Sequence, residues 1–450
     1  MDGLILENFR CFRAHCEIPL KPLTFLIGEN STGKTSFLSA IKVAWEIAFL
    51  RNDPNFNDEL FKLGTFDQIV SDKRLAEFKI GCWYSDISEI QSDRKTTKQA
   101  KCEFEGSFEK SYLEPILKCI NLELGEYSLK TERDKKPNEE KAKFKVCLLK
   151  NNEELLKTTI SGIPRFPPWS YIQYCLMESY DNTVKADKNN GNKVKLKGGF
   201  HIEKSELDKI YKILRYFDQH GNIYKPIPFA PIRAKPKRTY DEFSELQSSS
   251  GDNSFASYAR LSATNEPLKA DLDKNIMEYA NNSGLFKSLS VRKLGTSSDG
   301  PIQVNVRIGN KFHNLIDVGY GVSQILPILI DCHVKKNAKL VYLLQQPEVH
   351  LHPKAQAELG TFFTKLVNKN KLRFVIETHS DYIIDRIRSD IRRDTVDHIS
   401  PDDLSILYFQ RKGNEVIIHE IKVDENGNLL NVPKGYREFF LTEHRQLLGI

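Results

Sequence analysis

Residues 23–35, with the sequence LTFLIGENSTGKT, decide the fold that is expected for this chain. The apolar run at the start predicts a short buried strand, and residues 36–45 have the pattern of a helix. Between them, Gly28 to Thr35 fit G-x-x-x-x-G-K-[ST], the phosphate-binding P-loop. A plain glycine-containing turn is disfavoured, because the whole pattern matches and both flanking elements are expected. We therefore predict that this loop binds a nucleoside triphosphate.

The P-loop residues have distinct expected contacts with a triphosphate. Gly28 and Gly33 allow the backbone to fold tightly and to aim its N–H groups at phosphate oxygens. Lys34 is expected to reach the β- and γ-phosphates and Thr35 to offer its hydroxyl to Mg²⁺, while the helix N-terminus adds a favourable partial positive charge. The expected phosphate-binding residues are Gly28, Asn30, Ser31, Thr32, Gly33, Lys34, Thr35 and Ser36.

The composition indicates a soluble protein. A chain of 450 residues with 40% hydrophobic content suggests about two or three domains with sizeable cores. No stretch approaches the roughly 18 continuous apolar residues of a membrane span, and no basic region followed by an apolar run opens the chain. We therefore expect a cytoplasmic protein with no membrane partner. The net charge of +6, from 66 basic and 60 acidic residues, is too balanced to indicate nucleic-acid binding by itself.

The cysteines are expected to be reduced thiols. Eight of them are scattered along the chain without a C-x-x-C pair, so a zinc site is disfavoured. They are Cys11, Cys16, Cys82, Cys102, Cys119, Cys147, Cys175 and Cys332.

Strand-like runs predict an antiparallel sheet in the N-terminal half. Two strands are expected around residues 4–8 and 14–18, before the P-loop strand. A charged stretch at 130–143 is expected to be a solvated excursion at the tip of the sheet. The other expected strands of this sheet are 77–84, 101–107, 120–129, 144–150 and 155–161.

The region from 163 to 310 has a mixed pattern. Prolines and a polar, Lys/Asn/Gly-rich run predict irregular chain over 163–200. Helices are expected at 205–218, 255–263 and 268–281, and strands at 289–294 and 302–308.

The last part of the chain alternates strands and helices. Strands are expected at 340–344 and 372–376, and helices at 355–366 and 381–391. This alternation predicts a mostly parallel sheet that the strand at 23–27 joins, so the nucleotide site is assembled from both ends of the chain. The expected fold is α/β: a P-loop head with a mostly parallel sheet, an antiparallel β-subdomain and an inserted helical or irregular region. The expected domains are 1–75, 76–310 and 311–450.

Four further motifs carry a resemblance. They are Asn8-Phe9-Arg10, VGYGVSQ at 318–324, QPEVHLHP at 346–353 and Thr378-His379-Ser380. Together with the P-loop they resemble the ABC-type ATPases of the SMC, RecF and OLD class. More closely, they resemble the stand-alone AAA-type ATPases of bacterial anti-phage systems, such as the ATPase subunits of Septu and PARIS. The resemblance covers roughly 1–70 and 310–450.

The resemblance implies a mechanism in which two heads pack head to tail and sandwich two nucleotides. Ser323, in the stretch that resembles the ABC signature, then touches the γ-phosphate bound by the other subunit. His379 resembles the switch histidine at the γ-phosphate. Gln68 matches the Q-loop glutamine, which senses Mg²⁺ and the attacking water, and Arg10 helps to neutralise phosphate charge.

Each of these residues also has a structural interpretation. Ser323 could be a plain N-cap, His379 a turn residue before a capping serine, and Arg10 an exposed loop cation. His350 and His352 could suggest a metal, but the resemblance places them in the turn after the Walker B strand.

One position departs from the family pattern. Where the Walker B strand ends in an acid that holds Mg²⁺, often followed by a catalytic glutamate, this chain has Gln345 and Gln346. An amide supplies no charge to Mg²⁺ and is no general base near neutral pH. Gln345 could be an engineered Glu-to-Gln change, or a natural residue of a slow, switch-like ATPase, or its loss of charge could be compensated by Glu348 or Glu377. The expected catalytic residues are Gln345, Gln346 and His379, and the expected metal residues are Thr35, Gln68 and Gln345.

Two functions remain open. The first is an ATP- and Mg²⁺-binding, homo-oligomeric ATPase that acts as a nucleotide-dependent sensor or scaffold in phage defence, with a separate effector such as a nuclease. Acids after residue 395 are scattered, which disfavours a fused nuclease. The second is a RecF-like DNA-binding repair ATPase, and a transporter ATPase is a distant third. Alternatively, the lysines form a solvated loop and Arg233 braces the sheet. The basic residues that would contact DNA are Lys185, Lys188, Lys193, Lys195, Lys197, Arg233, Lys235, Lys237 and Arg238.

Overall fold

The computed structural model of this chain falls into two compact units. The first unit comprises Met1–Leu20, Ser36–Lys225 and Lys412–Val416, and the second comprises Lys21–Thr35, Pro226–Arg411 and Ile417–Ile450. The structure describes residues 1–49, 54–85, 102–111, 114–134, 143–161, 193–195, 201–204, 208, 224–231, 236–240, 254–255, 257–258, 261, 266–295, 300–393, 398–438, 442, 445–446 and 448.

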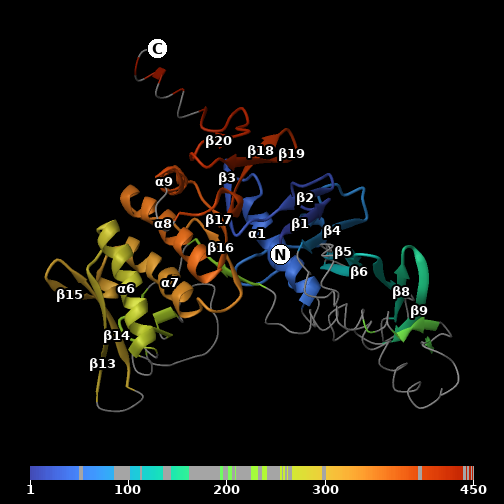
Figure 1. Cartoon of the computed structure of the whole chain (residues 1–450), viewed down its shortest axis with the longest axis horizontal. Coiled ribbons are helices and arrows are strands. Elements are labelled where there is room, and N and C mark those ends of the chain that lie inside the picture. Colours follow the sequence, from blue (N-terminus) through green and yellow to red (C-terminus); the bar gives the residue numbers. More distant parts are fainter. Residues whose placement is uncertain are drawn as a thin grey trace. The chain divides into compact units, whose positions relative to one another are not determined.

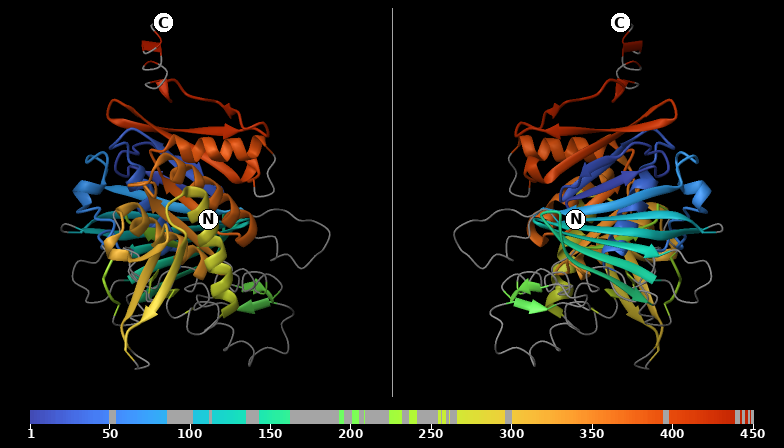
Figure 2. Two further views of the ribbon diagram at one scale, coloured as in Figure 1. Left: turned by 90° about the vertical axis from the view of Figure 1, so that its left-hand side faces the viewer. Right: turned by 90° about the vertical axis from the view of Figure 1, so that its right-hand side faces the viewer.

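The first unit contains an eight-stranded antiparallel sheet in the order β2-β1-β4-β5-β6-β7-β8-β9 (Figures 1 and 2). Its strands are β1 (Gly3–Glu7), β2 (Cys16–Pro19), β4 (Glu77–Tyr84), β5 (Cys102–Ser111), β6 (Glu114–Leu124), β7 (Tyr127–Asp134), β8 (Lys143–Lys150) and β9 (Glu153–Ser161). A two-stranded sheet of β10 (Lys193–Lys195) and β11 (His201–Glu203) also belongs to this unit, as do most of α1 (Lys34–Phe49) and all of α2 (Phe66–Ile69).

Five phenylalanines form the centre of the first unit's core. The rings of Phe78 and Phe108 stack with centroids 5.1 Å apart, and Phe56 meets Phe108 edge-on at 5.1 Å. Phe9 and Phe66 pack on Phe78 with centroid distances of 6.0 and 5.6 Å. This aromatic cluster joins strands β4 and β5 to the loop after β1, which carries Arg10, and to helix α2, which carries Gln68.

The predicted antiparallel sheet is confirmed, but two details are wrong. The solvated excursion expected at 130–143 is wrong for residues 130–134, because they continue strand β7 and pair with β8. The single strand expected over 120–129 is wrong, because the chain reverses there and forms β6 and β7. Gly125 has φ +57° in the two-residue turn, and Leu124 pairs with Tyr127 on the returning strand. A glycine in the left-handed region makes such a tight hairpin turn possible without steric cost.

The second unit contains a seven-stranded sheet in the order β12-β16-β17-β3-β18-β19-β20. Strands β16, β17, β3 and β18 are parallel, as the alternating pattern predicts. The bounds are β3 (Leu23–Gly28), β12 (Lys225–Phe229), β16 (Leu340–Gln345), β17 (Arg373–Glu377), β18 (Leu404–Lys412), β19 (Glu415–Val423) and β20 (Leu429–Leu430). The P-loop strand thus lies inside a sheet whose neighbours come from the C-terminal part of the chain.

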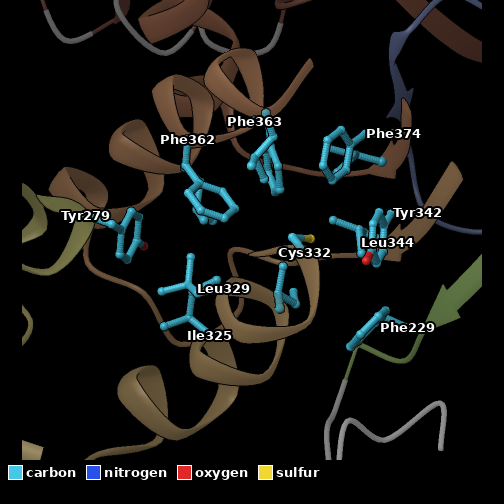
Figure 3. Close-up of a cluster of buried hydrophobic side chains, with 14 of the residues drawn as sticks. Phe229, Tyr279, Ile325, Leu329, Cys332, Tyr342, Leu344, Phe362, Phe363 and Phe374 are labelled. Atoms are coloured by element: carbon cyan, nitrogen blue, oxygen red, sulfur yellow. The ribbon is translucent and has the colours of Figure 1, made fainter. Parts of the chain in front are cut away.

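Four helices share the hydrophobic core of this sheet. They are α6 (Glu266–Ser283), α7 (Tyr320–Val334), α8 (Pro353–Asn370) and α9 (Asp381–Arg392), and short 3-10 turns lie at Leu315–Asp317 and Pro401–Asp403. Figure 3 shows the resulting core, in which strand side chains such as Tyr342 and Phe374 meet Phe363 from α8. The ring centroids of Phe363 and Phe374 are 5.0 Å apart.

A smaller three-stranded antiparallel sheet also belongs to the second unit (Figure 1). It consists of β13 (Ser288–Lys293), β14 (Ile302–Ile308) and β15 (Lys311–Asn314). The expected strands at 289–294 and 302–308 and the expected helix at 268–281 are confirmed, whereas β15 was not predicted. The expected helix at 205–218 lies outside the described residues except for Asp208, and the one at 255–263 is described only in part.

Among the described residues, no helix is long and apolar enough to cross a membrane. In the described part of the chain, six cysteines are free thiols: Cys11, Cys16, Cys82, Cys119, Cys147 and Cys332.

Candidate nucleotide-binding site

The P-loop backbone has the conformation that its glycines permit. Gly28 has φ +136°, and a Cβ at this position would lie 2.4 Å from the carbonyl oxygen of Phe409. Gly33 has φ +88° and Ser31 φ +61°. The hydroxyl of Thr32 donates to the carbonyl of Glu29 at 2.8 Å and closes the loop on itself. The loop is therefore a compact turn whose strained positions are two glycines and one small residue.

The Lys34 side chain lies folded into the P-loop. Its Nζ donates to the carbonyls of Gly28 at 3.0 Å and Glu29 at 2.7 Å, and the residue is 3% exposed. Burial lowers the pKa of Lys34, while the negative charges of Glu377 and Glu29 act in the opposite direction. An ammonium held by two loop carbonyls is placed at the centre of the loop.

A carboxylate meets the P-loop threonine. The hydroxyl of Thr35 donates to Oε2 of Glu377 at 2.9 Å. Glu377 ends strand β17, directly beside the P-loop strand, and is 6% exposed. Burial raises the pKa of Glu377, and the Thr35 bond and the Lys34 charge oppose that rise. The structure thus brings an acid to the hydroxyl that the sequence predicts to bind Mg²⁺.

Gln345 is the neighbour of Glu377 in the sheet. The two residues are register partners on parallel strands, so they end adjacent strands at the same level. Gln345 is 6% exposed, and its amide nitrogen is buried without a hydrogen-bond partner among the described residues. Gln346 has φ +43°, and its N–H donates to the carbonyl of Glu377 at 2.8 Å. A buried amide with an unused donor is costly unless something else contacts it.

Glu348 contacts the loop that carries His379. Its Oε1 accepts from the backbone N–H of His379 at 2.8 Å. The ring of His379 is exposed, and partial burial together with the positive charge of Lys34 lowers its pKa. Ser380 caps α9, accepting from the N–H of Ile383 at 3.4 Å. A neutral imidazole beside the P-loop lysine can donate or accept a hydrogen bond at neutral pH.

Ser323 lies inside the first turn of α7. The N-cap of this helix is Gly319, so the interpretation of Ser323 as a plain N-cap is wrong. Ser323 is 3% exposed, and its hydroxyl donates to the carbonyl of Tyr320 at 3.0 Å. A Cβ on Gly321 would lie 2.7 Å from the carbonyl of His350, so the helix start packs closely on the turn after β16. The exposed groups at this helix N-terminus belong to residues 319 and 320.

Arg10 and Gln68 lie in the first unit, and the other predicted residues except Ser36 lie in the second. Arg10 donates from Nη2 to the carbonyl of Leu63 at 2.6 Å, and burial lowers its pKa, so it is not an exposed loop cation. Gln68 is exposed, and its Oε1 accepts from the N–H of Thr65 at 2.9 Å. The structure therefore brings Arg10 to the chain around Gln68, since its backbone N–H also donates to the carbonyl of Ile69 at 2.6 Å.

The rings of His350 and His352 have structural contacts. The ring of His352 caps α8, since its Nδ1 accepts from the N–H of Lys354 at 3.4 Å. The ring of His350 lies 5.5 Å from that of Tyr320. Within the described ranges, no group of three or more His, Cys, Asp or Glu side chains is placed to hold a metal ion.

The basic residues considered for DNA are placed only in part. Lys193 and Lys195 lie on β10, and Arg238 pairs with Asp317 at 2.9 Å. Lys237 is exposed. The residues outside the described part of the chain are Lys185, Lys188, Lys197, Arg233 and Lys235.

Arg411 is a site residue that sequence reasoning missed. It lies on β18, which pairs with the P-loop strand so that Phe409 is opposite Gly28. Its guanidinium Nη2 donates to the carbonyl of Ser31, at the apex of the P-loop. The signal was available, because residues 404–409 are apolar except for Ser405, and a cation follows Gln410. The bond therefore ties strand β18 to the apex of the P-loop through the carbonyl of Ser31.

We expect Arg411→Ala to weaken ATP binding about fivefold. A charge-assisted hydrogen bond at an exposed position contributes about 1 kcal/mol, and its loss leaves the P-loop apex less ordered before nucleotide binds. Fluorescence titration with a labelled ATP analogue measures the change. Lys412→Ala removes the same charge from the next residue and is expected to stay within twofold of the parent chain. If both variants weakened ATP binding equally, the effect would come from net charge and not from the bond between Arg411 and Ser31.

These elements define an α/β P-loop protein in which the strand β17 lies between the P-loop strand and the strand that ends in Gln345. A sequence model of the AAA ATPase domain matches residues 1–384, and the chain belongs to this family. It is therefore an ATP-binding ATPase domain protein. Residues 399–440 match a second model, described as a protein of unknown function (DUF3696).

Solved structures show a distant likeness to SMC heads. The SmcHead bound to the C-winged helix domain of ScpA is 10% identical with a TM-score of 0.43, over 94% of this chain and 98% of that chain. The SMC head domain from Thermotoga maritima is 9% identical with a TM-score of 0.40, over 94% and 99%. The Smc head domain from Pyrococcus furiosus, bound to the C-terminal domain of ScpA, is 9% identical with a TM-score of 0.41, over 99% of each chain.

Proposed function

We propose that this chain binds Mg²⁺·ATP tightly, hydrolyses it slowly and uses the bound nucleotide to control its own assembly. The observation that carries the proposal is the bond from Thr35 to Glu377 beside the folded Lys34. A hydroxyl and a carboxylate are the oxygen ligands that Mg²⁺ prefers, and the lysine is placed for phosphate. The P-loop N–H groups supply the remaining contacts to the phosphates.

The residues present fit a bound Mg²⁺ ion with one carboxylate. Thr35 and Glu377 would hold the ion, which neutralises phosphate charge when bound. Gln345 would lie beside it, and its unused amide nitrogen fits a group that contacts a bound phosphate or water. Since an amide is no general base, this arrangement favours binding over turnover. We keep His379 as the residue expected near the γ-phosphate and Gln346 as an expected catalytic residue.

The proposed assembly is a head-to-tail pair in which the start of α7 contacts nucleotide bound by the other copy. The motifs at 318–324 and 346–353 support this proposal through their resemblance to ABC-type heads. Because the Ser323 hydroxyl bonds within its own helix, the exposed N-terminus of α7 would make this contact. The roles of Arg10 and Gln68 stay predictions.

The same resemblance supports a role in phage defence with a separate effector such as a nuclease. We propose this role for the chain as a sensor or scaffold whose nucleotide state is read by that effector. A gene for a nuclease next to the gene for this chain would support the proposal.

ATP is expected to double the molar mass of the chain in solution. Light scattering coupled to size exclusion, with and without Mg²⁺·ATP, measures the change. Tyr320→Glu puts a negative charge at the start of α7, where it would face a phosphate, and should leave the chain monomeric while ATP still binds. The matched control Tyr382→Glu changes another exposed tyrosine, on α9, and should still assemble. If the molar mass did not change on addition of ATP, the proposal of nucleotide-dependent assembly would be contradicted, but the proposal that the chain binds ATP would not.

A further inference from the structure

The sheet β13–β15 has one face turned to the core and one turned away from it. Val304 and Val306 of β14 are buried, and Leu289 and Val291 of β13 pack on the same core. Strand β13 lies against α6. Figure 1 shows this sheet beside α6. Because side chains alternate along a strand, the remaining residues form a second face. At one end of this face, the Asn314 amide donates to the carbonyl of Arg238 at 3.0 Å.

The register defines that outward face. Ser288 pairs with Arg307, which also pairs with Phe312, and Ser290 pairs with Asn305, which also pairs with Asn314. Directly paired residues of antiparallel strands lie on the same face. The outward face consists of Ser288, Ser290, Arg292, Gln303, Asn305, Arg307, Phe312 and Asn314.

The outward face carries positive charge and no carboxylate. Arg292 and Arg307 are exposed, and neither forms an ion pair with a described carboxylate. The surrounding sequence has the same bias, since Asp299 is the only acid in residues 287–314. The basic residues of that segment are Lys287, Arg292, Lys293, Arg307 and Lys311. This bias is local, because the whole chain is nearly balanced in charge.

An aromatic ring is exposed on the same face. Phe312 is 55% exposed, and the guanidinium carbon of Arg307 lies 5.9 Å from its ring centroid. An exposed phenylalanine among serines, amides and arginines is not explained by packing.

We propose that the outward face of the β13–β15 sheet binds single-stranded nucleic acid. The arginines would contact phosphates, Phe312 would stack on a base, and the amides of Gln303 and Asn305 would contact base edges. Acidic peptide would use the arginines but gains nothing from an exposed ring at this position. In a double-stranded nucleic acid the base faces are stacked on one another, so Phe312 could not stack on them. None of the residues on this face belongs to the proposed nucleotide site.

The test uses the full chain and fluorescein-labelled oligo(dT) of 20 nucleotides, followed by anisotropy. Phe312→Ala should weaken binding about tenfold, as expected for one lost stacking contact. Arg292→Ala with Arg307→Ala should weaken it further and lower the slope of log Kd against log salt by about 1.4, from about 0.7 per phosphate contact. If oligo(U) binds as tightly as oligo(dT), the same face also binds single-stranded RNA.

The matched control is Arg392→Ala with Lys422→Ala, which removes two exposed charges from α9 and β19 and should stay within twofold of the parent chain. Phe312 is exposed, so its replacement should leave the unfolding temperature unchanged. The proposal would be overturned if oligo(dT) showed no salt-sensitive binding, or if the control pair weakened binding as much as the two arginine replacements. It would also be overturned if a blunt duplex or polyglutamate bound as tightly as oligo(dT) and Phe312→Ala left that binding unchanged.

Discussion

Lys34→Ala is expected to weaken ATP binding about 100-fold. The ammonium lies folded among the P-loop carbonyls, so it is placed for phosphate contact without reaching in from solvent. Removing one partner of a buried, charge-assisted contact costs about 2.7 kcal/mol or more, which is a factor of about 100 in affinity. Titration with a fluorescent ATP analogue gives the affinity, and the ATP-induced rise in unfolding temperature should be lost in parallel.

Two controls separate this effect from misfolding or net charge. Lys422→Ala removes one exposed charge from β19 and should bind ATP like the parent chain. Lys34→Arg keeps the charge but changes its shape, and should bind between the parent and the alanine variant. Unchanged ATP affinity in a folded Lys34→Ala variant would contradict the placement of the triphosphate in this loop.

The parallel sheet was predictable because its signals are local. The P-loop pattern and the buried strand before it are contiguous in the sequence, and the helix at 381–391 has a strong apolar stripe. The neighbour of the P-loop strand on its other side, β18, was missed, although residues 404–409 are apolar except for Ser405. A strand buried on both faces has no alternation, so its pattern does not distinguish it from a buried helix segment.

The contacts within the site could be predicted only in part. That Glu377 lies near the P-loop was one of several alternatives, since the sequence does not say which acid reaches Thr35. The bond from Arg411 to Ser31 joins residues 380 positions apart and depends on the strand order. Ser323 was expected to face a phosphate, yet a hydroxyl one turn into a helix can bond to its own backbone, as it does here.

Gln345→Glu is expected to raise steady-state ATP turnover about 100-fold. Gln345 ends β16 beside Glu377, and its amide supplies neither a charge for Mg²⁺ nor a base for water. A carboxylate at this position would add both, and a positioned general base contributes about 10²–10⁴ in rate. Phosphate release under saturating Mg²⁺·ATP measures turnover. Burial already raises the pKa of Glu377, so a second acid beside it should lower the stability of the folded chain when Mg²⁺ is absent. Adding Mg²⁺ should restore that stability.

The matched comparisons locate the source of the gain. Gln346→Glu places a carboxylate one residue further, after a backbone with φ +43°, and a larger gain there would assign the base position to residue 346 instead. Glu377→Gln in the Gln345→Glu background should cancel most of the gain, because the carboxylate bonded to Thr35 is then lost. If the parent chain already turns over ATP at about 1 s⁻¹ or faster, Glu377 or Glu348 supplies the missing acid and the slow-turnover proposal fails.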